Sequence, residues 1–348
     1  MESFEVCISK NKELTKELYS NLIANSLYRD IIESKTFKRL KKINFLGAID
    51  YIYKNKKRHS RYDHTITVTL LALRYSKLQC LNLNEEKYLV CAALLHDIGH
   101  GPLSHSMEPA FKKLFGITHH KAGNNIIRGL SPLGSEIKTI LENNAIDIER
   151  LILLLDGKSK EKYSFALNNP INVDTIDGII RSYHFLHSIN KKSKLSLSVV
   201  PDIFDIVEAT VTGENQTILD EFWRLKDRVY KELINKEIHI FADTYSQKFI
   251  EEYDEYKDKI QENDFYSNEL EFKKNYTKLF EGLRQVRILE KEVNDTFKLK
   301  YINRNYKVNY EVQLNDITEL GKKYVHSKCK SEVNIKRRGE PRVQKSLI

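Results

Sequence analysis

The chain contains few residues that interrupt a helix: of its 348 residues only 13 are glycine and 6 are proline. A fold with many short strands and tight turns needs more of both, because glycine and proline supply the backbone angles of turns. Long helices are therefore favoured. With 41% hydrophobic residues, a chain of this length can bury a full core, as one large domain or as one domain with a smaller appendage.

The net charge of +9 at pH 7 favours anionic partners such as nucleotides or nucleic acid, although a lysine-rich solvated surface is the simpler source of most of it. The four cysteines follow no disulfide or CxxC spacing, so a reducing compartment fits best and we expect a cytoplasmic protein. The first residues do not resemble a signal peptide, and the apolar run Tyr88–Leu95 is too short to cross a bilayer. We expect no membrane association.

Hydrophobic spacing indicates where the helices lie. Apolar residues recur at helical spacing from Phe37 to Leu46, and Gly47 could end that helix, while residues 49–53 could form a short strand or an extended segment. A helix is predicted from Asp63, as N-cap, to Lys77. Further helices are predicted over residues 85–96, 106–115, 119–129, 133–142, 146–155, 173–187, 201–212, 215–256 and 266–291, with a polar loop at 190–195.

The last part of the chain changes character. Residues Tyr301–Leu314 alternate in a strand-like way, and residues 335–345 form a basic tail. We place a boundary near residue 297, which gives a helical domain over residues 1–297, with its core at about 30–235, and a small basic segment over 298–348. The predicted fold class is therefore all-α with a small, mixed, strand-containing C-terminal part.

Eight of the eleven histidines fall between His59 and His184, and one of them stands beside an aspartate at the end of an apolar helix. Such a pair, His96-Asp97, is costly to bury without a partner, and a divalent cation supplies one. Imidazole with carboxylate suits Mn, Fe, Zn, Co or Ni, and Mg is tolerated by carboxylate-rich sites. His64 and Asp174, each at the start of a predicted helix, are candidates for further ligands. Alone, a His-Asp pair is more often a helix-end histidine that complements the helix dipole.

Four segments around these residues resemble a known superfamily. They are Phe37–Gly47, similar to "FxRLrxIxqLG", His59–His64, similar to "HxRFEH", His96–His105, which differs from "HDIGHGPFSH" only at Leu103, and Val173–Asp177, similar to "VDxxD". The chain thereby resembles the HD-domain phosphohydrolases over about residues 30–235, in the branch that holds the deoxynucleoside triphosphate (dNTP) triphosphohydrolases. The Glu-Asp pair of the guanosine tetraphosphate hydrolases and the GYP tripeptide of cyclic-dinucleotide phosphodiesterases are absent from the sequence.

The resemblance implies a role for each matching residue. The implied metal ligands are His64, His96, Asp97 and Asp174. Arg61 would contact phosphate, and Tyr230 would lie beside the nucleotide sugar. The implied catalytic residues are His100, His105 and His120, with Glu108 orienting His105; His119 and His120 could be exchanged.

The substrate-reading positions depart from the pattern of the branch. Phe45 stands where the dNTP triphosphohydrolases place a glutamine, Thr175 replaces a phosphate-binding lysine, and Gly178 and Ser182 replace a tyrosine and an aspartate. Hydrolysis of a phosphate ester or anhydride is therefore better supported by the sequence than specificity for dNTPs.

The leading hypothesis is a metal-dependent nucleotide phosphohydrolase, and in particular one that releases triphosphate from a dNTP. The alternatives are a 5′-nucleotidase or other phosphomonoesterase on the same metal core, and a nucleic-acid-binding or nuclease-like protein, suggested by the basic tail. A scaffold with an inactive site is disfavoured because no ligand position is lost. We expect a nucleotide substrate, a homo-oligomer, and a tail that could contact nucleic acid.

Overall fold

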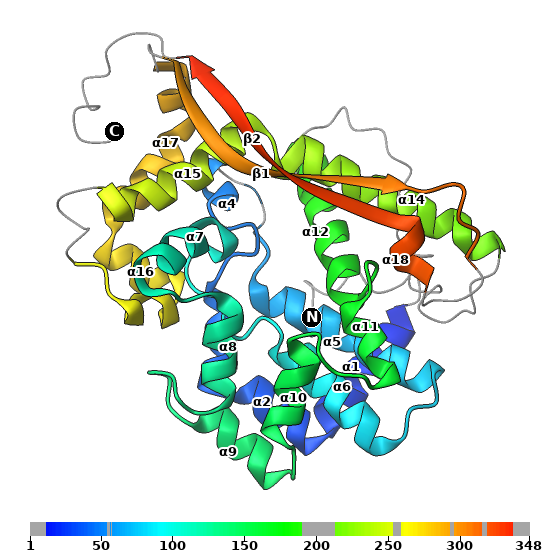
Figure 1. The fold of residues 1–348 in the computed structure, drawn as a ribbon. Coiled ribbons are helices and arrows are strands. Elements are labelled where there is room, and N and C mark those ends of the chain that lie inside the picture. The colour runs from blue at the N-terminus through cyan, green and yellow to red at the C-terminus, as the bar shows by residue number, and fades with distance from the viewer. Residues whose placement is uncertain are drawn as a thin grey trace.

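The computed structural model describes residues 12–53, 56, 58–189, 213–252, 259–292, 296–314 and 319–336. Over these residues the protein is mainly helical, with one two-stranded antiparallel sheet near the C-terminal end (Figure 1). This arrangement confirms the predicted fold class. Within the described part, no helix is both long enough and apolar enough to cross a membrane.

The elements follow one another in two runs. The first run comprises α1 Lys12–Ala24, α2 Ser26–Glu33, α3 Lys35–Lys38, the 3-10 helix η2 Arg39–Lys42, α4 Ile49–Ile52, α5 Arg61–Leu78, α6 Leu83–Leu95, α7 Ser104–Phe115, α8 His119–Ile127, α9 Glu136–Asn143, α10 Ile148–Leu155, the 3-10 helix η3 Lys162–Ser164, α11 Phe165–Asn168 and α12 Val173–Ile189. The second comprises α14 Gly213–Val229, the π-helix η4 Tyr230–Ile234, α15 Glu237–Glu252, the 3-10 helix η5 Glu262–Tyr266, α16 Glu269–Asn275, α17 Thr277–Glu292, β1 Thr296–Val308, α18 Leu320–Lys323 and β2 Tyr324–Lys336.

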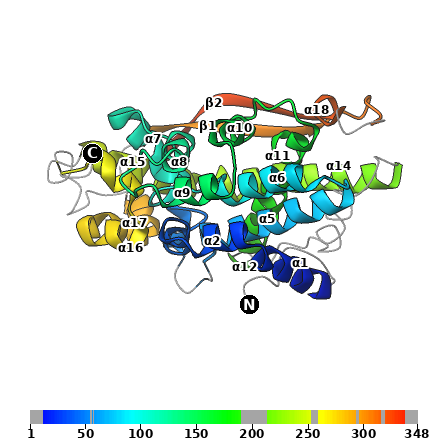
Figure 2. The same cartoon turned by 90° about the horizontal axis from the view of Figure 1, so that it is seen from below.

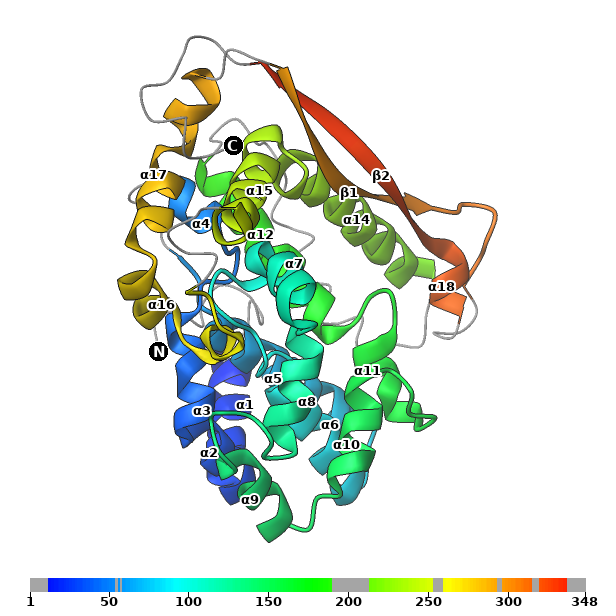
Figure 3. The ribbon, with the colours of Figure 1, turned by 60° about the vertical axis from the view of Figure 1, so that its left-hand side comes forward.

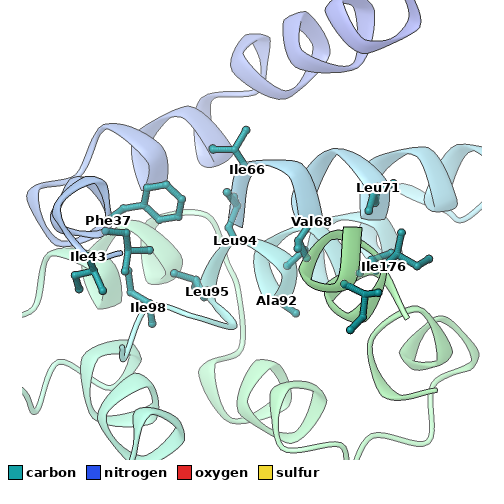
Figure 4. Close-up of a cluster of buried hydrophobic side chains, with 14 of the residues drawn as sticks. Phe37, Ile43, Ile66, Val68, Leu71, Ala92, Leu94, Leu95, Ile98 and Ile176 are labelled. Atoms are coloured by element: carbon teal, nitrogen blue, oxygen red, sulfur yellow. The ribbon is translucent and has the colours of Figure 1, made fainter. Parts of the chain in front are cut away.

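Helices α5 and α6 pack against each other at the centre of the molecule, and α12 packs on α5. Every residue of α5 from His64 to Ser76 is buried, as is every residue of α6 from Tyr88 to Leu95. A helix that is covered on all sides occupies the interior of a fold. Figure 4 shows Val68 and Leu71 of α5 close to Ile176 of α12 in this core. The ends of these three helices are therefore held firmly.

Strands β1 and β2 form a long antiparallel ribbon that pairs Thr296 with Lys336 at one end and Val308 with Tyr324 at the other. The ribbon runs along α14, as Figures 1 and 3 both show, and it lies on the opposite side of the molecule from α1 (Figure 2). The indole N–H of Trp223 on α14 lies 3.1 Å from the Lys307 carbonyl of β1 and 3.3 Å from the Val325 carbonyl of β2. The buried indole thus fixes the ribbon to the helix.

The predicted helix across Phe37–Leu46 is wrong. The chain forms α3 and η2, and then extends at Ile43, because Asn44 forms a β-bridge with Ser60 and the Phe45 N–H donates to the His59 carbonyl at 2.8 Å. This pairing, which a local pattern cannot reveal, joins two of the sequence segments that resemble the superfamily. Residues 49–52 form helix α4, so the strand considered there is also wrong.

Several helix boundaries also differ from the prediction. Ser60, not Asp63, is the N-cap of α5; Asp63 completes a capping box from the third helical position. The long helix predicted over 215–256 is interrupted by η4 and then by residues 235–236. The predicted loop at 190–195, the helix at 201–212 and residues 337–345 of the tail lie outside the described residues. Strand β2 was not foreseen.

Candidate metal centre

The ends of three buried helices bring His64, His96 and Asp174 together. His64 lies in the first turn of α5, where the Ser60 capping box fixes the start of the helix. His96 is the C-cap of α6, and Asp174 lies in the first turn of α12. Because α5 packs against both other helices, residues that are up to 110 positions apart meet at one point.

The ligand atoms of these residues face one another. The Nε2 atoms of His64 and His96 are 3.3 Å apart, and Oδ1 of Asp174 lies 3.0 Å from the first and 3.9 Å from the second. Asp97 lies beside them, with Oδ2 at 3.6 Å from His64 Nε2 and Oδ1 at 3.6 Å from His96 Nε2. We call His64, His96, Asp97 and Asp174 the metal group; it contains the four residues that the sequence predicts as ligands.

The hydrogen bonds behind the two imidazoles show which nitrogens are free to bind a cation. His96 Nδ1 lies 2.8 Å from the Ala93 carbonyl, which can only accept, so this nitrogen carries the proton in the neutral ring. His64 Nδ1 faces Oδ2 of Asp177 at 2.6 Å. In the neutral rings both Nε2 lone pairs therefore point at each other and at two carboxylates. A divalent cation matches this donor set, which is typical of Mn, Fe, Zn, Co or Ni sites.

A buried ion pair supports His64 from behind. Asp177 and Arg181 are almost completely buried, and Arg181 Nε lies 2.9 Å from Asp177 Oδ2. Burial would raise the pKa of Asp177, but Arg181 and His64 outweigh it and lower that pKa. Burial disfavours the charged form of His64, but hydrogen bonds to Asp174 and Asp177 outweigh it and raise the pKa of His64 to about 9. Carboxylates behind ligating histidines commonly fix the ring orientation in metal sites.

Arg61 is buried, and its guanidinium is tied to Asp97. Nη1 lies 2.7 Å from Asp97 Oδ2, Nε lies 3.0 Å from Ser104 Oγ, and Nη2 lies 3.2 Å from the Phe45 carbonyl. Burial would raise the pKa of Asp97, but electrostatic interactions with His96 and Arg61 hold it well below its usual value. The role of Arg61 as a phosphate contact stays a prediction.

Three further histidines cluster beside the metal group. The rings of His100 and His119 are stacked with centroids 4.3 Å apart, and the ring of His105 stands edge-on to both at 4.7 and 5.1 Å. Glu108 joins two of them, because one of its oxygens lies 3.2 Å from His105 Nδ1 and 2.9 Å from His119 Nδ1. We call His100, His105, His119 and Glu108 the histidine cluster.

The histidine cluster touches the metal group through His100, whose Nε2 lies 3.2 Å from Asp97 Oδ1. Burial and the charge of Arg61 hold the pKa of His100 well below its usual value, so its ring is neutral at pH 7. Burial would raise the pKa of Glu108, but hydrogen bonds from His105 and His119 outweigh it and lower that pKa, so the Glu108 carboxylate is an anion.

The structure brings His119, rather than His120, into this cluster. His120 is exposed, although its ring centroid lies only 4.0 Å from that of His119. His119 is the first residue of α8, directly after the N-cap Thr118, and this start directs its side chain toward Glu108. The sequence does not separate these adjacent histidines, because the packing of α8 determines which ring faces Glu108. The catalytic role predicted for His120 is untested, and the geometry favours His119 for it.

The loop that carries His96–His105 is held by Arg39, which stands in the segment Phe37–Gly47, and by Glu269; neither is among the predicted site residues. Arg39 donates from Nη2 to the Ile98 carbonyl at 2.7 Å and from Nη1 to the His100 carbonyl at 2.8 Å. Buried Glu269, at the start of α16, accepts from the Leu103 N–H at 3.2 Å. No local sequence signal identifies such pairs, because their partners are distant in the chain.

Phe45 and Gly178 shape one side of the metal group. The Phe45 ring centroid lies 4.8 Å from that of His64 and 4.8 Å from the Arg61 guanidinium carbon. A Cβ atom at position 178 would lie 3.6 Å from Phe45 Cζ, so the ring occupies the space next to this glycine. Tyr230, in η4, is not among the partners of the metal group; it packs on Tyr306 with ring centroids 4.7 Å apart.

The helical fold brings two histidines and two aspartates together, with further histidines beside them. This arrangement is typical of a metal-dependent hydrolase. The family model of the HD domain matches residues 61–210, which include the whole metal group and the histidine cluster. Residues 61–210 therefore match an HD domain, and this match supports the resemblance to the HD-domain phosphohydrolases.

Sequence relatives support the branch that includes dNTP triphosphohydrolases. The chain is 26% identical over 191 residues to the deoxynucleoside triphosphate triphosphohydrolase SAMHD1 homolog of Dictyostelium discoideum, covering 51% of this chain and 37% of that one. It is 28% identical over 210 residues to SAMHD1 of Bos taurus (50% and 36%), and 28% identical over 164 residues to an uncharacterized protein, the MG461 homolog of Mycoplasma pneumoniae (45% and 38%). These matches span less than two fifths of each relative.

The fold also resembles a solved structure. A hypothetical protein from Aquifex aeolicus superposes with a TM-score of 0.65 at 17% identity, over 89% of this chain and 92% of that one. This similarity shows that the two chains share a fold.

Proposed function

We propose that the chain is a metal-dependent phosphohydrolase of nucleotides and that its reaction converts a dNTP to a deoxynucleoside and triphosphate. The main support is the convergence of two Nε2 lone pairs and two carboxylates in the metal group. The histidine cluster adjoins this group, because His100 Nε2 lies 3.2 Å from Asp97 Oδ1. Relatives whose names state this activity support the substrate class.

A divalent ion (Mn, Fe, Mg, Zn, Co or Ni), held by the metal group, would polarise a phosphoryl oxygen and lower the pKa of a bound water. Arg61 orients the Asp97 carboxylate that would take part in holding this ion, through the 2.7 Å contact to Oδ2. It also adds positive charge that favours an anionic transition state.

The histidine cluster would handle the proton. Glu108 accepts from Nδ1 of both His105 and His119, so the Nε2 atoms of these rings are left to accept or donate a proton. The side chain of His105 is 63% exposed, so it can reach a substrate. We propose His105 as the group that gives a proton to the leaving oxygen, with Glu108 holding its ring.

A second candidate is a 5′-nucleotidase or another phosphomonoesterase with the same metal group. The observation that favours it is the apolar Phe45 ring, which lies against His64 and Arg61 where relatives of the dNTP triphosphohydrolase type have a sugar-reading amide. A broader substrate range would follow. The expected homo-oligomer and a contact between the tail and nucleic acid also remain proposals.

One experiment separates these functions. The purified protein is incubated with Mn²⁺ or Mg²⁺ and dNTPs, nucleoside monophosphates or single-stranded DNA, and the products are identified. Deoxynucleoside plus triphosphate supports the first proposal, orthophosphate from monophosphates supports the second, and cut DNA supports a nuclease. Asp97→Ala should abolish turnover, whereas Glu149→Gln, an exposed carboxylate paired with Arg128, should leave it unchanged. Full activity of Asp97→Ala would overturn the site.

A further inference from the structure

A group of basic side chains lies where the ribbon runs along α14. It consists of Lys226 on α14, Arg304 on β1, and His326 and Lys328 on β2, and we call it the ribbon cluster. Figure 3 shows the ribbon alongside α14, and α14 packs against α12, the helix that begins with the metal-group aspartate. Arg304, His326 and Lys328 lie outside the superfamily resemblance, and Lys226 lies near its end.

Lys226 connects the ribbon cluster to the metal group. Its ammonium lies 3.5 Å from the Pro170 carbonyl, just before α12, and burial lowers its pKa to about 8. The Asp174 carboxylate opposes this shift and the Arg304 guanidinium adds to it. The Lys226 ammonium thus lies against the backbone four residues before Asp174, whose side chain is 51% exposed.

Arg304 and Lys328 are directly opposite each other in the ribbon. Like charges in a cross-strand pair destabilise a sheet. His326 on the same strand is also affected, because burial and the charges of Lys328, Lys226 and Arg304 lower its pKa. Among the described residues, no carboxylate forms an ion pair with Lys226, Arg304 or Lys328. The nearby Asp227 is engaged by Lys231. The repulsion is therefore left for an anion to relieve.

A purely structural role explains only part of this arrangement. The Lys226 ammonium lies 4.5 Å from the Trp223 ring and 4.8 Å from the Tyr306 ring, and such cation–π contacts stabilise a fold. They do not account for the cross-strand pair of like charges. The π-helix η4 begins at Tyr230, whose hydroxyl accepts from Arg304 Nη1 at 3.3 Å, and π-helical turns often mark functional sites.

We infer that the ribbon cluster binds the phosphates of the substrate that lie beyond the phosphate attacked at the metal group. The ligand chemistry is a short polyphosphate chain, which can lie between Lys226 and Arg304 because both are flexible, multivalent donors. The identity of the substrate as a nucleotide rests on the proposed function. The binding of polyphosphate does not.

The single tryptophan of the chain provides a direct assay. Trp223 is buried and lies against the Lys226 ammonium, so movement of that charge toward a ligand should change the indole fluorescence. The full-length protein with excess Mg²⁺ is titrated with inorganic tripolyphosphate. Lys226→Met and Arg304→Gln should each weaken binding on the order of tenfold, the effect of losing one charge-assisted hydrogen bond. The control is Arg224→Gln, two positions earlier on α14, whose guanidinium donates to Tyr310; it should bind normally.

The titration can overturn the inference in two ways. Wild-type affinity for tripolyphosphate in both variants excludes the cluster as the binding site. An equal loss of affinity in Arg224→Gln shows that the effect comes from net charge and not from a specific site. If Lys226→Met melts at a lower temperature, Arg304→Gln, on the exposed ribbon, still decides. If the wild type turns over no nucleotide but both variants lose tripolyphosphate binding, only the proposed function is refuted. Nucleotide turnover with unaffected tripolyphosphate binding refutes the cluster alone.

Discussion

Asp177→Asn tests whether the buried pair behind His64 serves the metal group or only the fold. Asp177 and Arg181 are 0% and 2% exposed and are joined by two contacts of 2.9 Å. Removing one partner of a buried ion pair leaves an uncompensated charge and typically costs about 3–5 kcal/mol. We expect the lower end, about 3 kcal/mol, because Arg181 also donates to the Asp63 carbonyl and the Thr67 hydroxyl.

The same substitution should also change the metal affinity. Asp177 Oδ2 holds a proton on His64 Nδ1 at 2.6 Å and so leaves Nε2 free toward the metal group. An asparagine can turn its amide N–H toward Nδ1, which places the ring proton on Nε2. Loss of such a supporting carboxylate typically lowers metal affinity about 10–100-fold.

A double variant separates the two effects. In Asp177→Asn/Arg181→Met both charges are gone, so most of the lost free energy of unfolding should return, while the metal affinity should stay low. The assays are urea unfolding of the metal-free protein and titration with Mn²⁺ or Zn²⁺ by calorimetry. If the double variant regains both stability and metal affinity, Asp177 acts only through packing. Wild-type metal affinity in Asp177→Asn would refute the tautomer argument outright.

Three further perturbations can be checked by unfolding and activity assays. Burial raises the pKa of Asp50 to about 7. The protonated side chain therefore contributes to the free energy of unfolding, in full below pH about 4, and this contribution is lost as the pH rises through about 7. Asp50→Asn should remove this pH dependence, which is at most about 4 kcal/mol. Flat unfolding profiles of the wild type over this range would contradict that. Gly99→Ala places a Cβ 2.0 Å from the His119 carbonyl oxygen and should abolish turnover, whereas Gly116→Ala, at φ +64° with nothing within 4 Å, should cost only about 1 kcal/mol. Arg39→Ala should lower stability by about 2–4 kcal/mol and turnover with it; a variant with unchanged turnover would show that the 98–100 loop holds its shape alone.

Helices with strong local signals could be predicted from the sequence. Central helix α6 begins after the N-cap Asn82 and ends at His96, close to the predicted range, because its cap and its apolar run lie within one segment. The start of α12 at Val173 was also predicted, and with it the position of Asp174 at a helix start. The candidate ligands of the metal group followed from these helix ends and from the superfamily resemblance.

The errors arose where distant residues decide the local structure. Apolar spacing from Phe37 to Leu46 is helical, yet the chain extends at Ile43 because Asn44 and Phe45 pair with residues 59–60. In the same way, the π-helix at Tyr230 interrupts a segment whose composition favours one long helix. Side-chain orientation was equally hidden: only the packing of α8 shows that His119 faces Glu108 while His120 is exposed.

The C-terminal half of the chain determines the shape of the loop that carries the signature residues. Glu269 binds the Leu103 N–H, the Ser267 carbonyl accepts from Arg39 at 3.2 Å, and Gln247 donates to the Ser106 carbonyl at 2.9 Å. All three lie beyond residue 235, where the predicted core and the superfamily resemblance end. Glu269 and Gln247 bind the backbone of Leu103 and Ser106 directly, whereas Ser267 positions Arg39, which binds the carbonyls of Ile98 and His100. The signature therefore specifies the ligands, and residues outside the resemblance help to fix the loop that follows them.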